Sequence, residues 1–121
     1  MIKVFILEDN EERIAQFRKN FKNASLTITK ESKNAIEILR KESPFDYIFL
    51  DHDLGGNEMV ESGKGTGFEV AQWLSKNTLK KPKFGMYIHS LNGPGAENII
   101  AELKYGQRVP FVWTKVVDFK A

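Results

Sequence analysis

The sequence predicts one α/β domain, in which a parallel β-sheet is covered by helices. Short apolar runs alternate along the chain with helical segments of about 10–12 residues, a pattern typical of parallel sheets with right-handed crossovers. A length of 121 residues fits a single domain, residues 1–121, with one buried core. Apolar residues make up 41% of the chain and charged residues 28%, so the composition is that of a globular protein and not of a disordered one.

The first half of the chain contains the first two strands and helices of this pattern. Lys3–Leu7 is a short apolar run and is expected to be a strand. Glu11–Lys22 carries its apolar residues on a helical stripe. Leu26–Thr29 is short and rich in β-branched residues, which favours a second strand. Asn34–Lys41 places its apolar residues on one face of a second helix.

The second half repeats the alternation after a glycine-rich segment. Phe45–Leu50 is apolar enough to form a strand that is buried on both faces. The glycine-rich segment, Gly55–Gly67, leads into a helix that ends near Ser75, and Thr66 and Glu69 have the spacing of a capping box at its start. A fourth strand, a helix with proline at its start and glycine after its end, and a fifth strand are expected at Phe84–His89, Pro94–Tyr105 and Phe111–Trp113.

The composition also limits where the protein works and what it binds. The absence of cysteine excludes disulfides and thiolate metal sites, and it favours a reducing compartment such as the cytoplasm. The longest apolar runs, Val4–Leu7 and Tyr47–Leu50, are too short to cross a membrane, and the first residues lack the pattern of a signal peptide. With a net charge of only +2, we expect no sequence-specific DNA binding. A local basic cluster is expected to be a solvated surface loop: Lys76, Lys80, Lys81 and Lys83.

Polar residues gather where the predicted strands end. In an open parallel sheet the carboxyl ends of the strands lie at one rim, and the ligand binds there, at the point where the strand order reverses. The residues that follow the first, third, fourth and fifth strands are Glu8 and Asp9; Asp51, His52 and Asp53; His89, Ser90 and Asn92; and Thr114 and Lys115. Both histidines of the chain belong to this set. The sequence therefore predicts a functional site at this rim.

This order of residues resembles the receiver domains of two-component response regulators. Those domains carry an acidic pair after the first strand, an aspartate after the third, a serine or threonine after the fourth and a lysine after the fifth. The resemblance implies a flavodoxin-like fold, an open parallel five-stranded sheet of order 2-1-3-4-5 with helices on both faces. It implies that Asp51 accepts a phosphoryl group, whose oxygens Ser90 and Lys115 contact. It also implies that Glu8 and Asp9 bind a metal ion.

The residue types of the rim suit magnesium and phosphate chemistry in their own right. Mg²⁺ takes oxygen ligands in octahedral geometry, and two or three carboxylates supply them well. Four acidic residues of the rim are candidate ligands of Mg²⁺ or Mn²⁺: Glu8, Asp9, Asp51 and Asp53. Such a cation would offset the repulsion between an incoming phosphate and Asp51. Ser90 and Lys115 would then stabilise the equatorial oxygens during phosphoryl transfer.

The chain departs from ordinary receivers in four respects. The segment after Asp51 is longer and has no proline, and Lys115 is followed by Val116 where receivers usually have proline. Only six residues follow Lys115, too few for the fifth receiver helix. Additional polar groups stand at His52, Asp53, His89 and Asn92. The pattern Asp-His-Asp before Gly-Gly, together with His-Ser-x-Asn after the fourth strand, resembles the receiver-like family proposed to process cyclic phosphates.

Four of the candidate residues also have a purely structural interpretation. Asp51 could be simply a turn residue at the end of its strand. Asp9 and Glu12 have the spacing of a capping box, so Asp9 could simply cap the first helix. Asp53 could be only a turn former before two glycines. Asn92 precedes a glycine and is first of all a turn residue.

The two histidines have a structural alternative because of their neighbours. Successive side chains of a strand point to opposite faces of the sheet. If Asp51 and Ser90 face the site, then His52 and His89 face a helix, unless the strand has already ended. For each histidine, a structural role and a catalytic role remain open.

Two functions follow from these residues. The first is a metal-dependent phosphoesterase that opens a cyclic or terminal phosphate of a nucleotide or an RNA end. Asp51 or a metal-bound water would attack, and His52 or His89 would protonate the leaving ribose oxygen. The second is a signalling module that a histidine kinase phosphorylates on Asp51. The additional histidines and the missing last helix favour the enzyme, whereas a metal-free interaction domain is disfavoured because all the required residue types are present.

Overall fold

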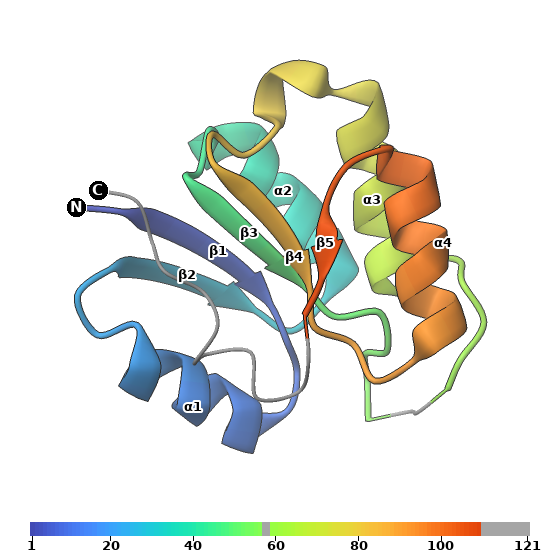
Figure 1. Ribbon diagram of the computed structural model, residues 1–121, viewed down its shortest axis with the longest axis horizontal. Helices are drawn as coiled ribbons and strands as arrows, with labels where there is room; N and C mark the ends of the chain where they lie inside the picture. Colours follow the sequence, from blue (N-terminus) through green and yellow to red (C-terminus); the bar gives the residue numbers. More distant parts are fainter. Residues whose placement is uncertain (57–58, 110–121) are drawn as a thin grey trace.

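Strands and helices alternate along the part of the chain that the structure describes, residues 1–56 and 59–109. The computed structural model has five strands, four α-helices and one short 3₁₀ turn within these residues (Figure 1). The strands are β1 (Lys3–Leu7), β2 (Ser25–Thr29), β3 (Tyr47–Leu50), β4 (Gly85–Ile88) and β5 (Gln107–Arg108). The helices are α1 (Glu11–Asn20), α2 (Ser32–Glu42), α3 (Gly67–Lys76) and α4 (Gly93–Leu103), and the 3₁₀ turn is η1 (Thr78–Lys80).

The five strands form one parallel sheet in the order β2-β1-β3-β4-β5. This order confirms the flavodoxin-like fold that the resemblance to receiver domains implies. Helix α1 lies on one face of the sheet, and α2, α3 and α4 cover the other face (Figure 1). The strand order reverses between β1 and β3, so the carboxyl ends of these two strands are where such a sheet binds its ligand.

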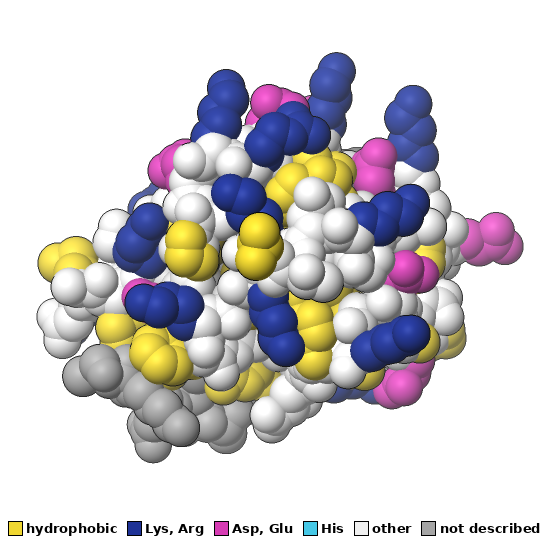
Figure 2. All heavy atoms as spheres, turned by 90° about the horizontal axis from the view of Figure 1, so that it is seen from above, with side chains coloured by type: hydrophobic (Ala, Val, Ile, Leu, Met, Phe, Trp, Pro, Cys, Tyr) yellow, Lys and Arg dark blue, Asp and Glu magenta, His cyan; other side chains and the backbone are white. Residues whose placement is uncertain are grey.

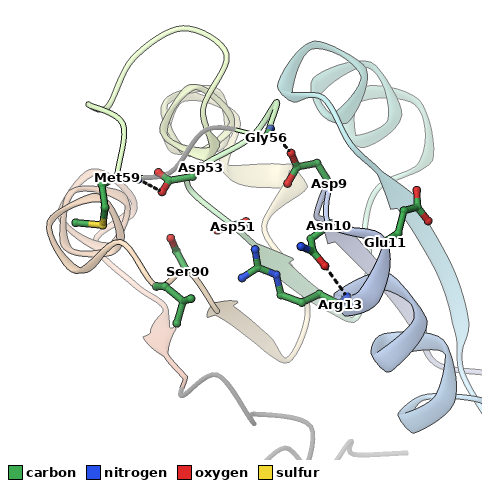
Figure 3. Close-up of a pocket in the computed structure, with 10 residues that line it drawn as sticks. Asp9, Asn10, Glu11, Arg13, Asp51, Asp53, Gly56, Met59 and Ser90 are labelled. Carbon is green, nitrogen blue, oxygen red and sulfur yellow. Dashed lines mark hydrogen bonds between the residues drawn. The ribbon is translucent and has the colours of Figure 1, made fainter.

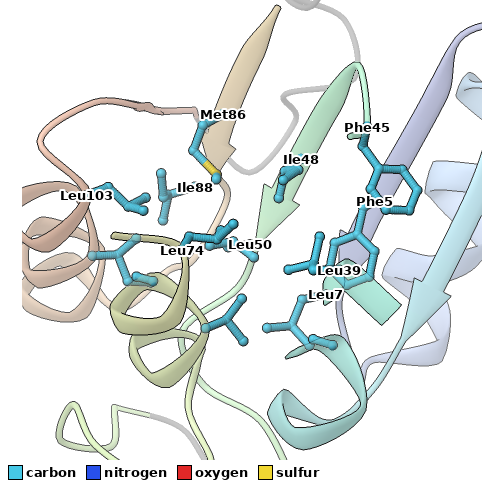
Figure 4. Packing of buried hydrophobic residues seen from close by; sticks show 14 of the residues in the cluster. Phe5, Leu7, Leu39, Phe45, Ile48, Leu50, Leu74, Met86, Ile88 and Leu103 are labelled. Atoms are coloured by element: carbon cyan, nitrogen blue, oxygen red, sulfur yellow. The ribbon is translucent and has the colours of Figure 1, made fainter. Parts of the chain in front are cut away.

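The alternation of side chains along β1 produces a core on each side of the sheet. Phe5 and Leu7 belong to the larger cluster, which the sheet forms with α2, α3 and α4 (Figure 4). Val4 and Ile6 belong to the smaller cluster, in which they pack with Phe17 of α1. Because β1 and β3 are buried on both faces, their sequences are continuous apolar runs, as predicted.

The fifth strand was predicted at Phe111–Trp113, which lies outside the described residues. Within the described part of the chain, β5 pairs with β4, and the Val109 N–H donates to the Ile88 carbonyl at 3.0 Å. Both described residues of β5 are exposed, so this part of the strand is held by backbone pairing and carries no apolar signal. The predicted lack of a fifth helix concerns residues 116–121, which are also outside the described part of the chain.

The predicted basic cluster lies between α3 and β4, at the end of the sheet away from the predicted site. Three of its lysines are exposed: Lys76, Lys81 and Lys83. On the face shown in Figure 2, basic side chains are spread over the surface with acidic ones among them. Within residues 1–56 and 59–109, no helix has both the length and the apolar character that crossing a membrane requires.

Candidate functional site

A pocket of about 380 Å³ lies at the carboxyl ends of β1, β3 and β4 (Figure 3). It brings together four of the predicted site residues: Asp9, Asp51, Asp53 and Ser90. Its lining is completed by Asn10, Glu11, Arg13, Gly56, Met59 and Leu91. The other predicted residues that the structure describes, Glu8, His52, His89 and Asn92, lie behind this lining. Lys115 lies outside the described residues.

Glu8 is fully buried behind the pocket and holds several elements together. One of its carboxylate oxygens accepts hydrogen bonds from the backbone N–H groups of Asp9, at 3.0 Å, and Asn10, at 3.1 Å. The other lies 3.0 Å from His89 Nε2 and 3.2 Å from Arg13 Nε. Burial acts to raise the pKa of Glu8, but the bond and charge of His89, the Asn10 N–H and the Arg13 charge outweigh it and hold the pKa below its ordinary value. Glu8 is therefore a fixed negative charge behind the pocket.

Asp9 faces the pocket because its neighbour caps the helix. The side chain of Asn10 is the N-cap of α1 and accepts the Arg13 N–H at 3.0 Å, so the interpretation of Asp9 as a helix cap was wrong. Asn10 can take this role because an asparagine oxygen reaches the third residue of a helix as readily as an aspartate oxygen does. Asp9 instead accepts a hydrogen bond from the Gly56 N–H at 2.9 Å, across the mouth of the pocket (Figure 3).

Asp51 lies at the floor of the pocket and is only 2% exposed. Its carboxylate accepts the N–H of His52 at 2.8 Å. Burial raises the pKa of Asp51 to about 6, and the charge of Glu8 adds to this effect, although His89, Arg13 and Ser90 act in the opposite direction. A cation beside Asp51 would favour the charged form of its carboxyl group.

A metal ion would find two overlapping sets of ligands in this corner of the fold. Potential ligand atoms of Glu8, Asp51 and His89 all lie within 4.8 Å of one another, in the buried layer. On the open side, Asp51 shares the pocket with Asp9 and Asp53. Oxygen ligands suit Mg²⁺ and Mn²⁺, and the carboxylates of the open side are the ones that a hydrated cation can reach.

His89 lies on the side of the sheet that faces α1. Its ring packs edge-on against Phe17, with the ring centroids 5.2 Å apart, and its Nε2–H donates to Glu8. Ser90, the next residue, lines the pocket. The predicted alternation is therefore confirmed, and His89 lies behind the pocket, beside Glu8 and close to Asp51.

His52 lies on the opposite side of the sheet, beneath the start of α4. Its Nδ1 is 2.7 Å from the Asp53 carboxylate, and its Nε2 is 2.8 Å from the Ser62 hydroxyl. The ring is fully buried. His52 also follows the predicted alternation, and it acts on the pocket through Asp53.

Asp53 and Asn92 join the loop after β3 to the start of α4. Asn92 is the N-cap of α4, where its side-chain oxygen accepts the Gly95 N–H at 2.9 Å, and its amide donates to Asp53 at 2.9 Å. Asp53 also accepts the Met59 N–H at 2.6 Å. Burial acts to raise the pKa of Asp53, but the bonds from His52, Asn92 and Met59 lower it below the ordinary value. Asp53 is thus a charged group held at the wall of the pocket. Asn92 stands at a turn, as its sequence context predicted, and it also orients Asp53.

Two glycines let helices begin against the residues that follow β3. A Cβ atom at Gly67 would lie 1.9 Å from the Asp51 carbonyl oxygen, so a side chain cannot be placed there. The Gly67 N–H instead donates to the His52 carbonyl at 2.9 Å, and Thr66 caps α3, as predicted. A Cβ atom at Gly95 would lie 2.5 Å from the ring of His52. Both contacts fix the backbone around Asp51.

Arg13 is a pocket residue that the sequence analysis missed. It extends from the first turn of α1 toward Asp51 and Ser90 (Figure 3). Its Nε lies 3.2 Å from the buried carboxylate of Glu8, and the side chain is 24% exposed. Among the described residues that line the pocket, Arg13 is the only one with a positive charge. The position of Arg13 three residues after the Asn10 cap was the signal that could have identified it.

One family of proteins matches most of this chain. The model of the family described as "Cyclic-phosphate processing Receiver domain" matches residues 2–105. No curated protein matches the chain.

Solved receiver domains share the fold. The chemotaxis protein CheY4 of Vibrio cholerae has a TM-score of 0.68 and 15% identity, covering 91% of this chain and 86% of that chain. The non-phosphorylated HemR receiver domain of Leptospira biflexa has a TM-score of 0.67 and 19% identity, covering 91% and 82%. A response regulator of Burkholderia pseudomallei, solved with a phosphorylated aspartic acid, a calcium ion and citrate, has a TM-score of 0.66 and 11% identity, covering 91% and 59%. At these identities the comparison shows the fold alone, and it is the fold that the resemblance implied.

Proposed function

We propose that this chain, which belongs to the family of cyclic-phosphate processing receiver domains, is an enzyme. Its proposed reaction is the hydrolysis of a cyclic or terminal phosphate ester of a nucleotide or an RNA end. The observation that carries the proposal is the composition of the pocket. The cavity is lined, among others, by the carboxylates of Asp9, Asp51 and Asp53, by the hydroxyl of Ser90 and by the guanidinium group of Arg13. Carboxylates suit a hard cation, and a guanidinium group suits a phosphate, so the two groups of a metal–phosphate complex each have a partner.

The residues of the pocket fit Mg²⁺ or Mn²⁺. Asp9, Asp51 and Asp53 would hold the cation from the open side, and the fourth acidic residue, Glu8, would support it from the buried layer. A bound cation supplies charge neutralisation and a more acidic water at this position. The raised pKa of Asp51 supports this assignment, because a buried carboxyl group with that pKa lacks sufficient positive charge around it. The calcium ion in the response regulator of Burkholderia pseudomallei shows that a protein of this fold binds a divalent cation.

The chain's own groups would bind and orient the phosphate. Arg13 and Ser90 would contact its oxygens, and Lys115 is proposed as a second cationic contact. Asp51 would act as nucleophile or would orient the attacking water. His89 holds Glu8 and His52 holds Asp53. We therefore propose that each histidine acts on the reaction through a carboxylate, and that protonation of the leaving oxygen by either one would need that contact to open.

Addition of Mg²⁺ is expected to stabilise the fold. A cation that binds only the native state at ten times its Kd adds about 1.4 kcal/mol, which corresponds to a rise in Tm of roughly 5 °C for a domain of this size. Thermal melts with and without MgCl₂ or MnCl₂ measure the effect, with NaCl of equal ionic strength as the control. An unchanged Tm, together with no heat of binding in calorimetry, would contradict the metal site.

A phosphoacceptor module is the second candidate function, with a histidine kinase as partner. It is supported by the placement of Asp51 and Ser90 in one pocket, which the resemblance to receiver domains associates with phosphoryl acceptance. In that case Asp51 would keep the phosphoryl group and the pocket would release no product from an ester.

One incubation separates the two functions. The protein is mixed with Mg²⁺ and, in turn, with 2′,3′-cyclic nucleotides, RNA that ends in a cyclic phosphate, and acetyl phosphate. The proposal expects multiple turnovers of at least one cyclic phosphate and no lasting label on Asp51. Stable labelling by acetyl phosphate without turnover of any ester would contradict the enzyme and favour the phosphoacceptor.

A further inference from the structure

The pocket has an apolar wall that phosphate chemistry does not explain. Met59 and Leu91 both line it, and each is 63% exposed. Within residues 1–56 and 59–109, the other exposed large hydrophobic residues, Met1, Leu79 and Phe84, do not line this pocket. The two side chains therefore line the same pocket as the carboxylates and Arg13, and an inorganic phosphate would make no use of them.

The backbone holds Leu91 in its exposed position. Leu91 stands between Ser90 and Asn92, which are each only 3% exposed. The Asn92 N–H donates to the Ser90 hydroxyl at 3.1 Å, and Asn92 then caps α4. This tight turn directs both neighbours inward, so that the side chain between them projects toward solvent at the pocket.

Met59 is held at the pocket in a similar way. Its N–H donates to Asp53 at 2.6 Å, and its φ of +53° lies in the left-handed region, which a residue with a side chain rarely adopts. The bond to Asp53 fixes Met59 on the same wall as one of the proposed metal ligands (Figure 3). A flexible thioether in this position can adapt to a flat ring and makes favourable contacts with aromatic groups.

We infer that Met59 and Leu91 form a subsite for the nucleobase of the nucleotide whose phosphate is bound beside Asp51 and Arg13. This inference rests on the proposed function. The volume of about 380 Å³ is within the range of pockets that hold a whole small organic ligand, roughly 300–1,000 Å³, and not only its phosphate. A nucleobase presents two flat apolar faces, and contact with it removes the exposed surface of both side chains from water. The ligand is thus a nucleoside phosphate, and the apolar wall selects it over phosphates without a base.

Three ligands of increasing size test the inference in the presence of Mg²⁺. Calorimetry gives the Kd of the full chain for inorganic phosphate, for ribose 3-phosphate and for adenosine 3′-monophosphate. Adenosine 3′-monophosphate is expected to bind about 10-fold more tightly than ribose 3-phosphate, because it buries apolar surface that the sugar phosphate does not reach. In the double variant Met59→Ser/Leu91→Ser this preference is expected to disappear, with the Kd for ribose 3-phosphate and for inorganic phosphate unchanged.

Leu79→Ser is the matched control, because Leu79 is 92% exposed and does not line the pocket. It is expected to keep the full preference for adenosine 3′-monophosphate. Equal affinity of the unaltered protein for the ligands with and without a base would overturn the base subsite and leave the proposed function standing. An equal loss of affinity for all three ligands in the double variant would also overturn it, since the side chains would then support the pocket as a whole. Failure of every phosphate to bind would overturn the proposed function, and the subsite with it.

Discussion

Replacement of Asp51 by asparagine is expected to abolish turnover and, at the same time, to stabilise the metal-free protein at neutral pH. Asp51 is the central carboxylate of the pocket and belongs to both possible sets of metal ligands. Its loss is expected to lower kcat/KM for a cyclic phosphate by at least about 10³-fold. Asparagine has almost the same shape, so the fold is retained, and the uncharged amide avoids the unfavourable burial of a carboxylate.

The raised pKa of Asp51 predicts how the stability gained by Asp51→Asn depends on pH. Burial raises the pKa of Asp51 from 3.8 to about 6, so the folded protein binds a proton more tightly than the unfolded chain does. The contribution of Asp51 to stability is therefore most favourable below pH 4 and is lost as the pH rises to about 6. Above that pH the loss is on the order of 3 kcal/mol. Asp51→Asn is expected to recover much of it at pH 7 and nothing at pH 3.5.

Urea unfolding of the metal-free protein at the two pH values measures this difference, and kinetics with Mg²⁺ measure the loss of activity. Asp46→Asn is the control, because Asp46 stands at the amino end of β3, away from the pocket. It is expected to keep its activity. Retained turnover in Asp51→Asn would contradict the role of Asp51, and equal effects on stability at both pH values would contradict the raised pKa.

Short-range patterns predicted the parallel α/β sheet and the rim where its polar residues meet, whereas the strand order was implied by the resemblance to receiver domains. The continuous apolar runs Lys3–Leu7 and Tyr47–Leu50 mark strands that are buried on both faces, and polar residues after them must meet at one edge of a parallel sheet. Asp51 and Ser90 could thus be brought together without knowledge of any contact. The alternation along a strand predicted that His52 and His89 face away from the site only if the strand continues through them, so the sequence left both roles open.

The remaining features depend on the detailed path of the backbone in loops and at helix starts, which short sequence patterns do not determine. Arg13 enters the pocket from the first turn of α1, where its guanidinium group is paired with Glu8. Met59 reaches the pocket through a single hydrogen bond to Asp53, in a loop without apolar periodicity. The choice between Asp9 and Asn10 as helix cap depends on a one-residue difference in where α1 begins, and sequence patterns do not determine helix ends that closely.

Arg13 provides the second large effect, because Arg13→Gln is expected to lower kcat/KM by about 10²–10³-fold. The guanidinium group lies in the pocket with Asp51, and its Nε is 3.2 Å from the Glu8 carboxylate. A guanidinium group can bind two phosphate oxygens at once. Its removal is expected to raise the Kd for inorganic phosphate as well, since the same contact is made in the ground state.

Arg13→Lys separates the charge of this side chain from its geometry. A lysine is a single point of charge and cannot pair with Glu8 and also bind two oxygens, so we expect it to recover only part of the lost activity. Arg18→Gln, on the exposed side of the same helix, is expected to change neither kcat nor KM. Millimolar guanidinium is expected to restore activity to Arg13→Gln but not to Asp51→Asn, because the added cation can occupy the space of the missing side chain only in the first variant. If Arg13→Gln keeps its melting temperature and has the same kcat/KM as Arg18→Gln, Arg13 does not bind the phosphate. If Arg13→Gln instead has a lower Tm and an activity that guanidinium does not restore, the role of Arg13 is to hold Glu8.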